Sequence, residues 1–174
     1  MSTLKSNKVI LFFTLFFFYC LVFTSCEKKN KEEKTFISPP KIDAQVLTEI
    51  AEANLKVVAI TQKAQENQME DSTRKAFQKV ENQHLQIKKE IHKIAENNFI
   101  IIPNILYDTN LIKKFISEAN TFLYLKKTEK ILLDELSYYQ SISKSSKNND
   151  LKTLVTNNIL AIQKNIVSIQ QEQK

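Results

Sequence analysis

Side chains suited to acid–base or metal chemistry are scarce in this sequence. It has two histidines and two cysteines among 174 residues. His84 falls on the apolar stripe of a predicted helix, whereas His92 lies eight positions later and about 80° further around the helix. A single inward histidine is more often a hydrogen-bonded core residue than a ligand or a base. We therefore expect His84 to serve packing, and no residue to be catalytic.

A metal site is the alternative that His84 leaves open. Glu81 and His84 have the Glu-x-x-His spacing of carboxylate-bridged metal sites in helical bundles, and Glu129 on a later helix could face inward beside them. A di-iron site needs two such pairs and further carboxylates. The alternative function is thus a ferritin-like metal-binding or stress-response protein with a degenerate metal site at His84, Glu81 and Glu129. The favoured interpretation has no cofactor.

The absence of glycine removes several enzyme classes. Phosphate-binding loops, dinucleotide-binding fingerprints and nucleophile elbows need backbone positions that a side chain would block, and this chain has no glycine. Nucleotide-dependent chemistry is therefore not expected, and the sequence indicates a protein that is not an enzyme.

The N-terminus has the pattern of an export signal. Lys5 and Lys8 precede an apolar run over residues 9–23, which is shorter than the ~20 residues that a membrane-spanning helix needs. Small residues then lead to Cys26, so the segment resembles a lipobox, although Phe23 replaces the usual leucine. We expect residues 1–25 to be a lipoprotein signal peptide, and Cys26 to carry palmitate and diacylglycerol. The alternative is a membrane-anchoring helix with an ordinary cysteine.

Cleavage before Cys26 changes the chemistry of the chain. The net charge falls from +6 to +4 because Lys5 and Lys8 are removed without any acid. Cys20 leaves with the signal and Cys26 is acylated, which excludes disulfides, thiolate metal sites and a cysteine nucleophile. Lysine and glutamate are interspersed, so nucleic-acid binding is not expected. The expected partners are the membrane, through the lipid on Cys26, and an unknown envelope protein or ligand.

A charged linker follows the lipidated residue. Residues 27–34 are charged and nearly free of apolar side chains, and Pro39 and Pro40 follow. We expect residues 26–41 to be a flexible tether. The Lys31-Glu32-Glu33 triplet resembles the surface-export signal of some Gram-negative lipoproteins. We expect the protein in the bacterial cell envelope, lipid-anchored in the outer membrane on its periplasmic or surface face.

The remaining residues, 42–174, follow the period of amphipathic helices. We predict an all-α domain, an antiparallel four-helix bundle of ferritin-like type, with a short extra helix in the crossover. The long helices are expected from a cap at Asp43 over about 26 residues, from a cap at Asp71 or Ser72 to about residue 97, from about residue 120 to 143 with Phe122 facing inward, and from a cap at Asp150 onward. The short helix is expected from Thr109 to about residue 119.

The segment from Asn54 to Pro103 resembles the bacterial domain-of-unknown-function family 4142, whose members are exported helical bundles with a ferritin-like fold. The residues that match the family pattern are Asn54, Ala64, His84, Ile91, Ala95 and Pro103, followed by Phe122 and Tyr124. The resemblance implies acids where this chain has Val57 and Gln83, histidines where it has Leu132 and Asn165, and a proline where it has Leu160. A shift of one turn in the second half of the alignment would bring Glu129 or Glu135 to the polar positions. Valine and leucine offer no lone pair to a cation. We therefore expect a non-catalytic envelope lipoprotein with a structural or binding role.

Overall fold

The computed structural model describes residues 41–103, 108–114 and 120–174, except for the side chains of residues 111–112. The expected signal peptide, Cys26 and the tether up to residue 40 lie outside the described residues. The described part of the chain is helical and contains no strand. Its helices are α2 (Ala44–Gln65), α3 (Asp71–Asn97), α4 (Thr109–Lys113), α5 (Thr121–Ser145) and α6 (Asn149–Gln171).

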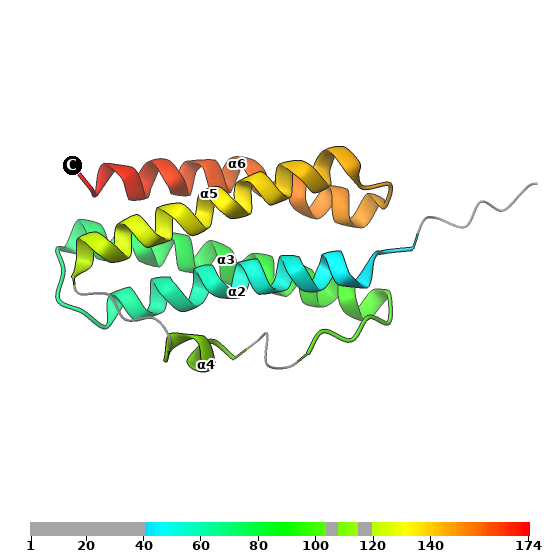
Figure 1. The fold of residues 1–174 in the computed structure, drawn as a ribbon, viewed down its shortest axis with the longest axis horizontal. Helices are drawn as coiled ribbons and strands as arrows, with labels where there is room; N and C mark the ends of the chain where they lie inside the picture. The colour runs from blue at the N-terminus through cyan, green and yellow to red at the C-terminus, as the bar shows by residue number, and fades with distance from the viewer. Residues whose placement is uncertain (1–40, 104–107, 115–119) are drawn as a thin grey trace, which may run out of the picture. The chain divides into compact units, whose positions relative to one another are not determined.

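The four long helices form a bundle made of two antiparallel hairpins (Figure 1). Helix α2 packs against α3 and α5, and α6 packs against α5 and α3. The predicted all-α four-helix bundle is thus confirmed. None of the described helices combines the length and the apolar composition that a membrane span requires.

Side-chain caps set the beginnings of three helices. The Asp43 carboxylate accepts hydrogen bonds from two backbone N–H groups of α2 at 2.9 and 3.4 Å, as predicted. Asn120 caps α5 and Asn148 caps α6, each at 3.0 Å. The prediction that Asp150 caps the last helix is wrong, because Asn148 already satisfies the free N–H group and places Asp150 in the first turn.

The two ends of α3 depart from the usual signals. The cap lies at Glu70, which makes no side-chain hydrogen bond to the helix, so the predicted cap at Asp71 or Ser72 is wrong. At the other end, Phe99 has φ 55°. Ile100 N–H donates to Ala95 O at 2.9 Å and Phe99 N–H to Glu96 O at 3.2 Å, which is a Schellman motif whose left-handed position is usually glycine. This chain has no glycine to place there.

The core follows the predicted stripes in all four long helices. Its largest fully buried side chains include Tyr139, Phe77, Leu47, Ile50, Ile60, Ile87, Leu132 and Ile162. Phe122 is the exception, because it is 50% exposed and the inward place in the first turn of α5 belongs to Tyr124. Two residues along a helix are about 200° apart, so both cannot face the core. Phe122 instead lies beneath the ammonium group of Lys126, 5.7 Å from the ring centre.

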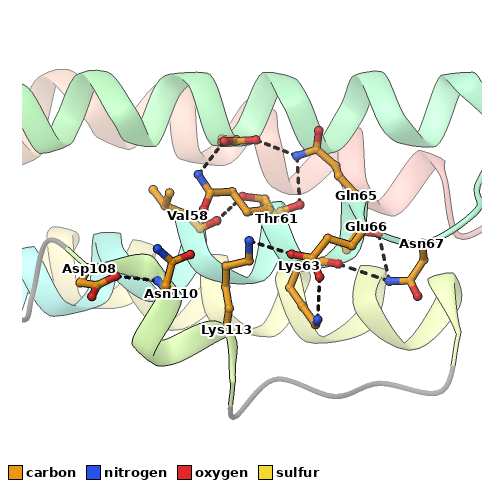
Figure 2. Close-up of polar contacts among 12 residues, drawn as sticks. Val58, Thr61, Lys63, Gln65, Glu66, Asn67, Asp108, Asn110 and Lys113 are labelled. Atoms are coloured by element: carbon orange, nitrogen blue, oxygen red, sulfur yellow. Dashed lines mark hydrogen bonds and ion pairs between the residues drawn. The ribbon is translucent and has the colours of Figure 1, made fainter.

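The crossover between the hairpins contains the short helix α4, which packs against α2. We predicted a helix to about residue 119. The structure ends it at Lys113, and residues 115–119 lie outside the described residues. Lys113 forms an ion pair with Glu66 at 2.7 Å, and Lys63 binds the same carboxylate at 2.6 Å (Figure 2). The crossover helix is therefore held to the end of α2 by a shared acid.

Candidate functional site

His84 and Glu135 form an acid–base pair in the centre of the bundle. His84 extends from α3 and Glu135 from α5, and their Nε2 and Oε2 atoms are 2.9 Å apart. Both side chains are 0% exposed. The contact joins two helices that do not form a hairpin with each other. It is the one point among the described residues where a buried histidine meets a buried carboxylate.

The backbone fixes one of the two protons that His84 can carry. Nδ1 lies 2.8 Å from Val80 O, one turn earlier in α3, and a carbonyl oxygen can only accept, so Nδ1 donates. The second proton lies between Nε2 and Glu135 Oε2. Burial lowers the pKa of His84, but the Glu135 carboxylate and the Val80 carbonyl together outweigh burial and raise that pKa above its ordinary value. These contacts therefore favour the protonated form of His84 more than water does.

The second oxygen of Glu135 and the hydroxyl of Tyr139 make no hydrogen bond of ordinary length and angle among the described residues, but the two groups lie close enough for Tyr139 to donate weakly to Glu135. Both atoms are buried, and Tyr139 lies one turn after Glu135 in α5. Burial, the charge of Glu135 and a hydrogen-bond contact with Glu135 raise the pKa of Tyr139 well above 10, so the phenol stays protonated. Further buried oxygens without a partner belong to Asn54 of α2, Thr128 of α5 and Asn165 of α6.

Polar side chains from all four long helices thus enter an otherwise apolar core. Asn165 Nδ2 donates to Gln83 Oε1 at 2.8 Å, and Asn158 Nδ2 donates to Glu90 Oε2 at 3.2 Å, so α6 is hydrogen-bonded to α3 at two levels. Such contacts favour one register of the helices over others. The apolar pattern around His84 in the sequence gives no sign of its distant partner Glu135.

The residues of the predicted metal site do not come together. Glu81 accepts hydrogen bonds from Gln62 and Gln65 of α2, at 2.9 and 2.7 Å, and Figure 2 shows Gln65 reaching from α2 toward α3. Glu129 accepts hydrogen bonds from Gln170 and Gln173 at the far end of α6. In the described part of the chain, no three histidine, cysteine, aspartate or glutamate side chains are placed to hold a metal ion. The degenerate site at His84, Glu81 and Glu129 is therefore not assembled.

Glu135 is the residue that the sequence analysis did not select as the partner of His84. A signal for it exists, since Glu135 lies three residues after Leu132 and four before Tyr139, both fully buried. That spacing places it on the inward seam of α5. The pattern can identify a buried acid but not its partner, because His84 and Glu135 are 51 positions apart.

The His84–Glu135 pair has the chemical groups of a general base, but a substrate has no access to them. A catalytic base must reach a substrate proton at hydrogen-bond distance, and the side chains of His84 and Glu135 have no exposed surface. The pair is able to hold a proton, to fix α3 against α5 and to make stability depend on pH. It cannot meet a substrate without opening of the bundle.

No family model, curated protein or solved structure matches this chain. The resemblance to the domain-of-unknown-function family 4142 remains a prediction.

Proposed function

We propose that this chain is a non-catalytic lipoprotein of the bacterial cell envelope, anchored through Cys26 in the outer membrane, whose helical bundle has a structural or binding role. The observation that carries the non-catalytic part is the complete burial of His84 and Glu135. The lipobox-like sequence before Cys26 supports the anchor. The lipid anchor and the buried pair are compatible with either the periplasmic or the surface face of the outer membrane.

The exposed apolar side chains at one end of the bundle support a membrane-facing orientation. Phe99 is 95% and Ile101 is 91% exposed, whereas Ile102 between them and the crossover is buried at 6%. They follow α3, at the end of the bundle where α2 begins (Figure 1). Lys41 comes 15 positions after Cys26, and that length of chain spans at most about 50 Å. A lipid on Cys26 would therefore hold this end within about 50 Å of the bilayer.

The anchor is tested by metabolic labelling with a palmitate analogue in a Gram-negative host. We expect label in the wild-type chain and in Cys20→Ser, but none in Cys26→Ser. The two cysteines make a matched pair, because Cys20 lies inside the apolar run and Cys26 at its end. Label that persists in Cys26→Ser would refute the anchor, as would an unlabelled wild-type chain.

The non-catalytic role is tested against the metal-binding alternative by elemental analysis of the chain purified without chelator and then exposed to iron, manganese or zinc. We expect less than stoichiometric metal and an unchanged melting temperature. Stoichiometric metal that is lost in His84→Ala would instead support a ferritin-like metal-binding protein. Glu70→Gln serves as the control, because the Glu70 side chain makes no hydrogen bond to α3 and Glu70 is not among the residues of the alternative metal site.

A further inference from the structure

Two apolar side chains, Phe99 and Ile101, project from the bundle just after α3, and we call them the apolar tip. They are more than 90% exposed, whereas the other exposed large apolar side chains of the described residues are 39–59% exposed. Ile100 packs against the core and Ile102 is buried, so the side chains alternate between inward and outward directions. The two outward places are thus filled by apolar residues where the fold alone would favour polar ones.

The backbone of Phe99 fixes the outward direction of the tip. In the Schellman motif at the end of α3, Ile100 turns toward the core and Phe99 takes the left-handed position, with φ 55°. Glycine or asparagine adopts this conformation more easily than a bulky residue does. The core gains almost no packing from a side chain that is this exposed. A strained residue that the core does not need indicates a contact outside the bundle.

The apolar tip lies at the end of the bundle where the chain enters it. The described chain begins at Lys41, directly before α2, and α3 runs back to this same end (Figure 1). Lys41 comes 15 positions after Cys26, and a flexible tether of that length has an r.m.s. extension on the order of 20 Å. Helix α2 alone, with 22 residues, is about 33 Å long. An attachment at Cys26 therefore favours contact between a bilayer and this end of the bundle over the opposite end.

The size and charge of this end favour a bilayer over a protein partner. A specific protein interface buries roughly 800 Å² on each partner, which two side chains cannot supply, whereas a membrane that is already held nearby needs few contacts. Exposed lysines and acids occur here in similar numbers, so the charges do not select a strongly acidic or basic partner. These charged residues are Lys41, Lys93, Lys144 and Lys147, and Asp43, Glu96 and Asp150.

We infer that Phe99 and Ile101 insert into the bilayer to which the chain is attached, as a second membrane contact that sets the orientation of the bundle. This inference rests on the proposed attachment near Cys26 and names the part of the bundle that meets the membrane. Burying one phenylalanine or isoleucine side chain changes a partition constant by roughly 10- to 100-fold. Even a myristoyl chain alone gives only marginal membrane binding, so insertion of the tip depends on the tether.

The inference is tested by fluorescence, because the chain has no tryptophan and one introduced tryptophan reports its own surroundings. Phe99→Trp places the reporter in the tip, and Phe122→Trp places it at the start of α5, at the opposite end of the bundle. Each full-length chain is purified from the membranes of a Gram-negative host and reconstituted into phosphatidylcholine vesicles with or without bromine on the acyl chains. We expect a blue-shifted emission and quenching by bromine in Phe99→Trp, unaffected by high salt, and neither effect in Phe122→Trp.

A second substitution in the Phe99→Trp chain tests the other side chain of the tip. Ile101→Asn should lower the ratio of inserted to free tryptophan about tenfold or more. Leu160→Asn removes an exposed leucine from the middle of α6 and should leave that ratio unchanged. Equal effects of these two variants would overturn the inference, as would equal quenching of Phe99→Trp and Phe122→Trp. A blue shift that grows with the protein-to-lipid ratio without quenching by bromine would assign the tip to a second copy of the chain instead.

Palmitate labelling of Cys26 is measured separately, so a failed anchor and a failed tip are distinguishable. A labelled chain whose tryptophan is not quenched in Phe99→Trp would overturn the inference and leave the lipid anchor in place. A quenched tryptophan in an unlabelled chain would support the membrane contact and refute the lipid on Cys26, because the apolar run over residues 9–23 would then attach the chain.

Discussion

Replacing the buried His84–Glu135 pair gives the sharpest test of the bundle interior. Two unit charges ~4 Å apart attract by about 4 kcal/mol at an effective dielectric constant of about 20. Dehydrating each ion costs several kcal/mol, and here both side chains are 0% exposed. The two effects are of similar size, so the intact pair contributes little net stability. Removing one partner leaves the other charge buried, and the attraction that offset its dehydration cost is lost.

We therefore expect His84→Leu and Glu135→Leu each to lower the free energy of unfolding by about 3–5 kcal/mol. The double variant should be within ~1 kcal/mol of the wild type or more stable, because no unpaired charge is left and two apolar side chains fill the space. Urea denaturation followed by circular dichroism measures all four proteins. A single variant that costs less than about 1 kcal/mol would refute the buried ion pair. So would a double variant whose cost is the sum of the two single costs.

The same pair makes a prediction about pH. The folded-state pKa of His84 is raised above the ordinary value of 6.5, so its contribution to stability is complete below ~6.5 and is lost as the pH rises through the folded-state value. The wild type should lose stability from pH 6 toward alkaline pH, and the double leucine variant should lose less over that range. Equal slopes in the two proteins would contradict the raised pKa of His84.

Three further substitutions test the caps, the left-handed residue and the core, all by thermal or urea denaturation. Asp43→Ala should lower the free energy of unfolding by about 1 kcal/mol, because it removes two hydrogen bonds to the start of α2. Glu70→Ala changes a cap without such bonds and should lower it by only a few tenths of a kcal/mol. Equal losses in the two variants would contradict this role for Asp43. Phe99→Asn should raise stability by about 0.5–1 kcal/mol, since it relieves the left-handed phenylalanine (φ 55°) and removes little buried surface; a loss of stability would show that Phe99 is held by contacts. Leu132→Ala should lower the free energy of unfolding by about 2–5 kcal/mol, because Leu132 is 0% exposed. Leu133→Ala should lower it by less than ~1 kcal/mol, because Leu133 is 46% exposed. A larger loss in Leu133→Ala than in Leu132→Ala would mean that α5 is rotated about its axis.

The sequence was sufficient to predict the number and the approximate bounds of the long helices. Apolar spacings of three and four residues depend only on the geometry of one helix, and for this reason the stripes of α2 and α6 agree with the burial of their residues. The cap at Asp43 is equally local. The caps of α3 and α6 were misplaced by one or two residues, because neighbouring polar residues compete for the same free N–H groups.

The partners of polar side chains could not be predicted in this way. Of the three residues proposed for a metal site, Glu81 is bonded to glutamines of α2 and Glu129 to glutamines of α6. The direction in which each glutamate side chain points depends on the rotation of its helix about its own axis within the bundle. A rotation of one position, about 100°, exchanges an inward side chain for an outward one. Phe122 was misassigned for the same reason, since Tyr124 takes the inward place.

By itself the sequence determined the amphipathic helices, the inward position of His84 and the lipobox-like segment before Cys26, because each depends on neighbours within a few residues along the chain. Only the tertiary structure decided that His84 meets Glu135, 51 positions away, and that Asn165 meets Gln83. These contacts join different helices, and their pairing depends on how the four amphipathic faces pack together to exclude water from a common core.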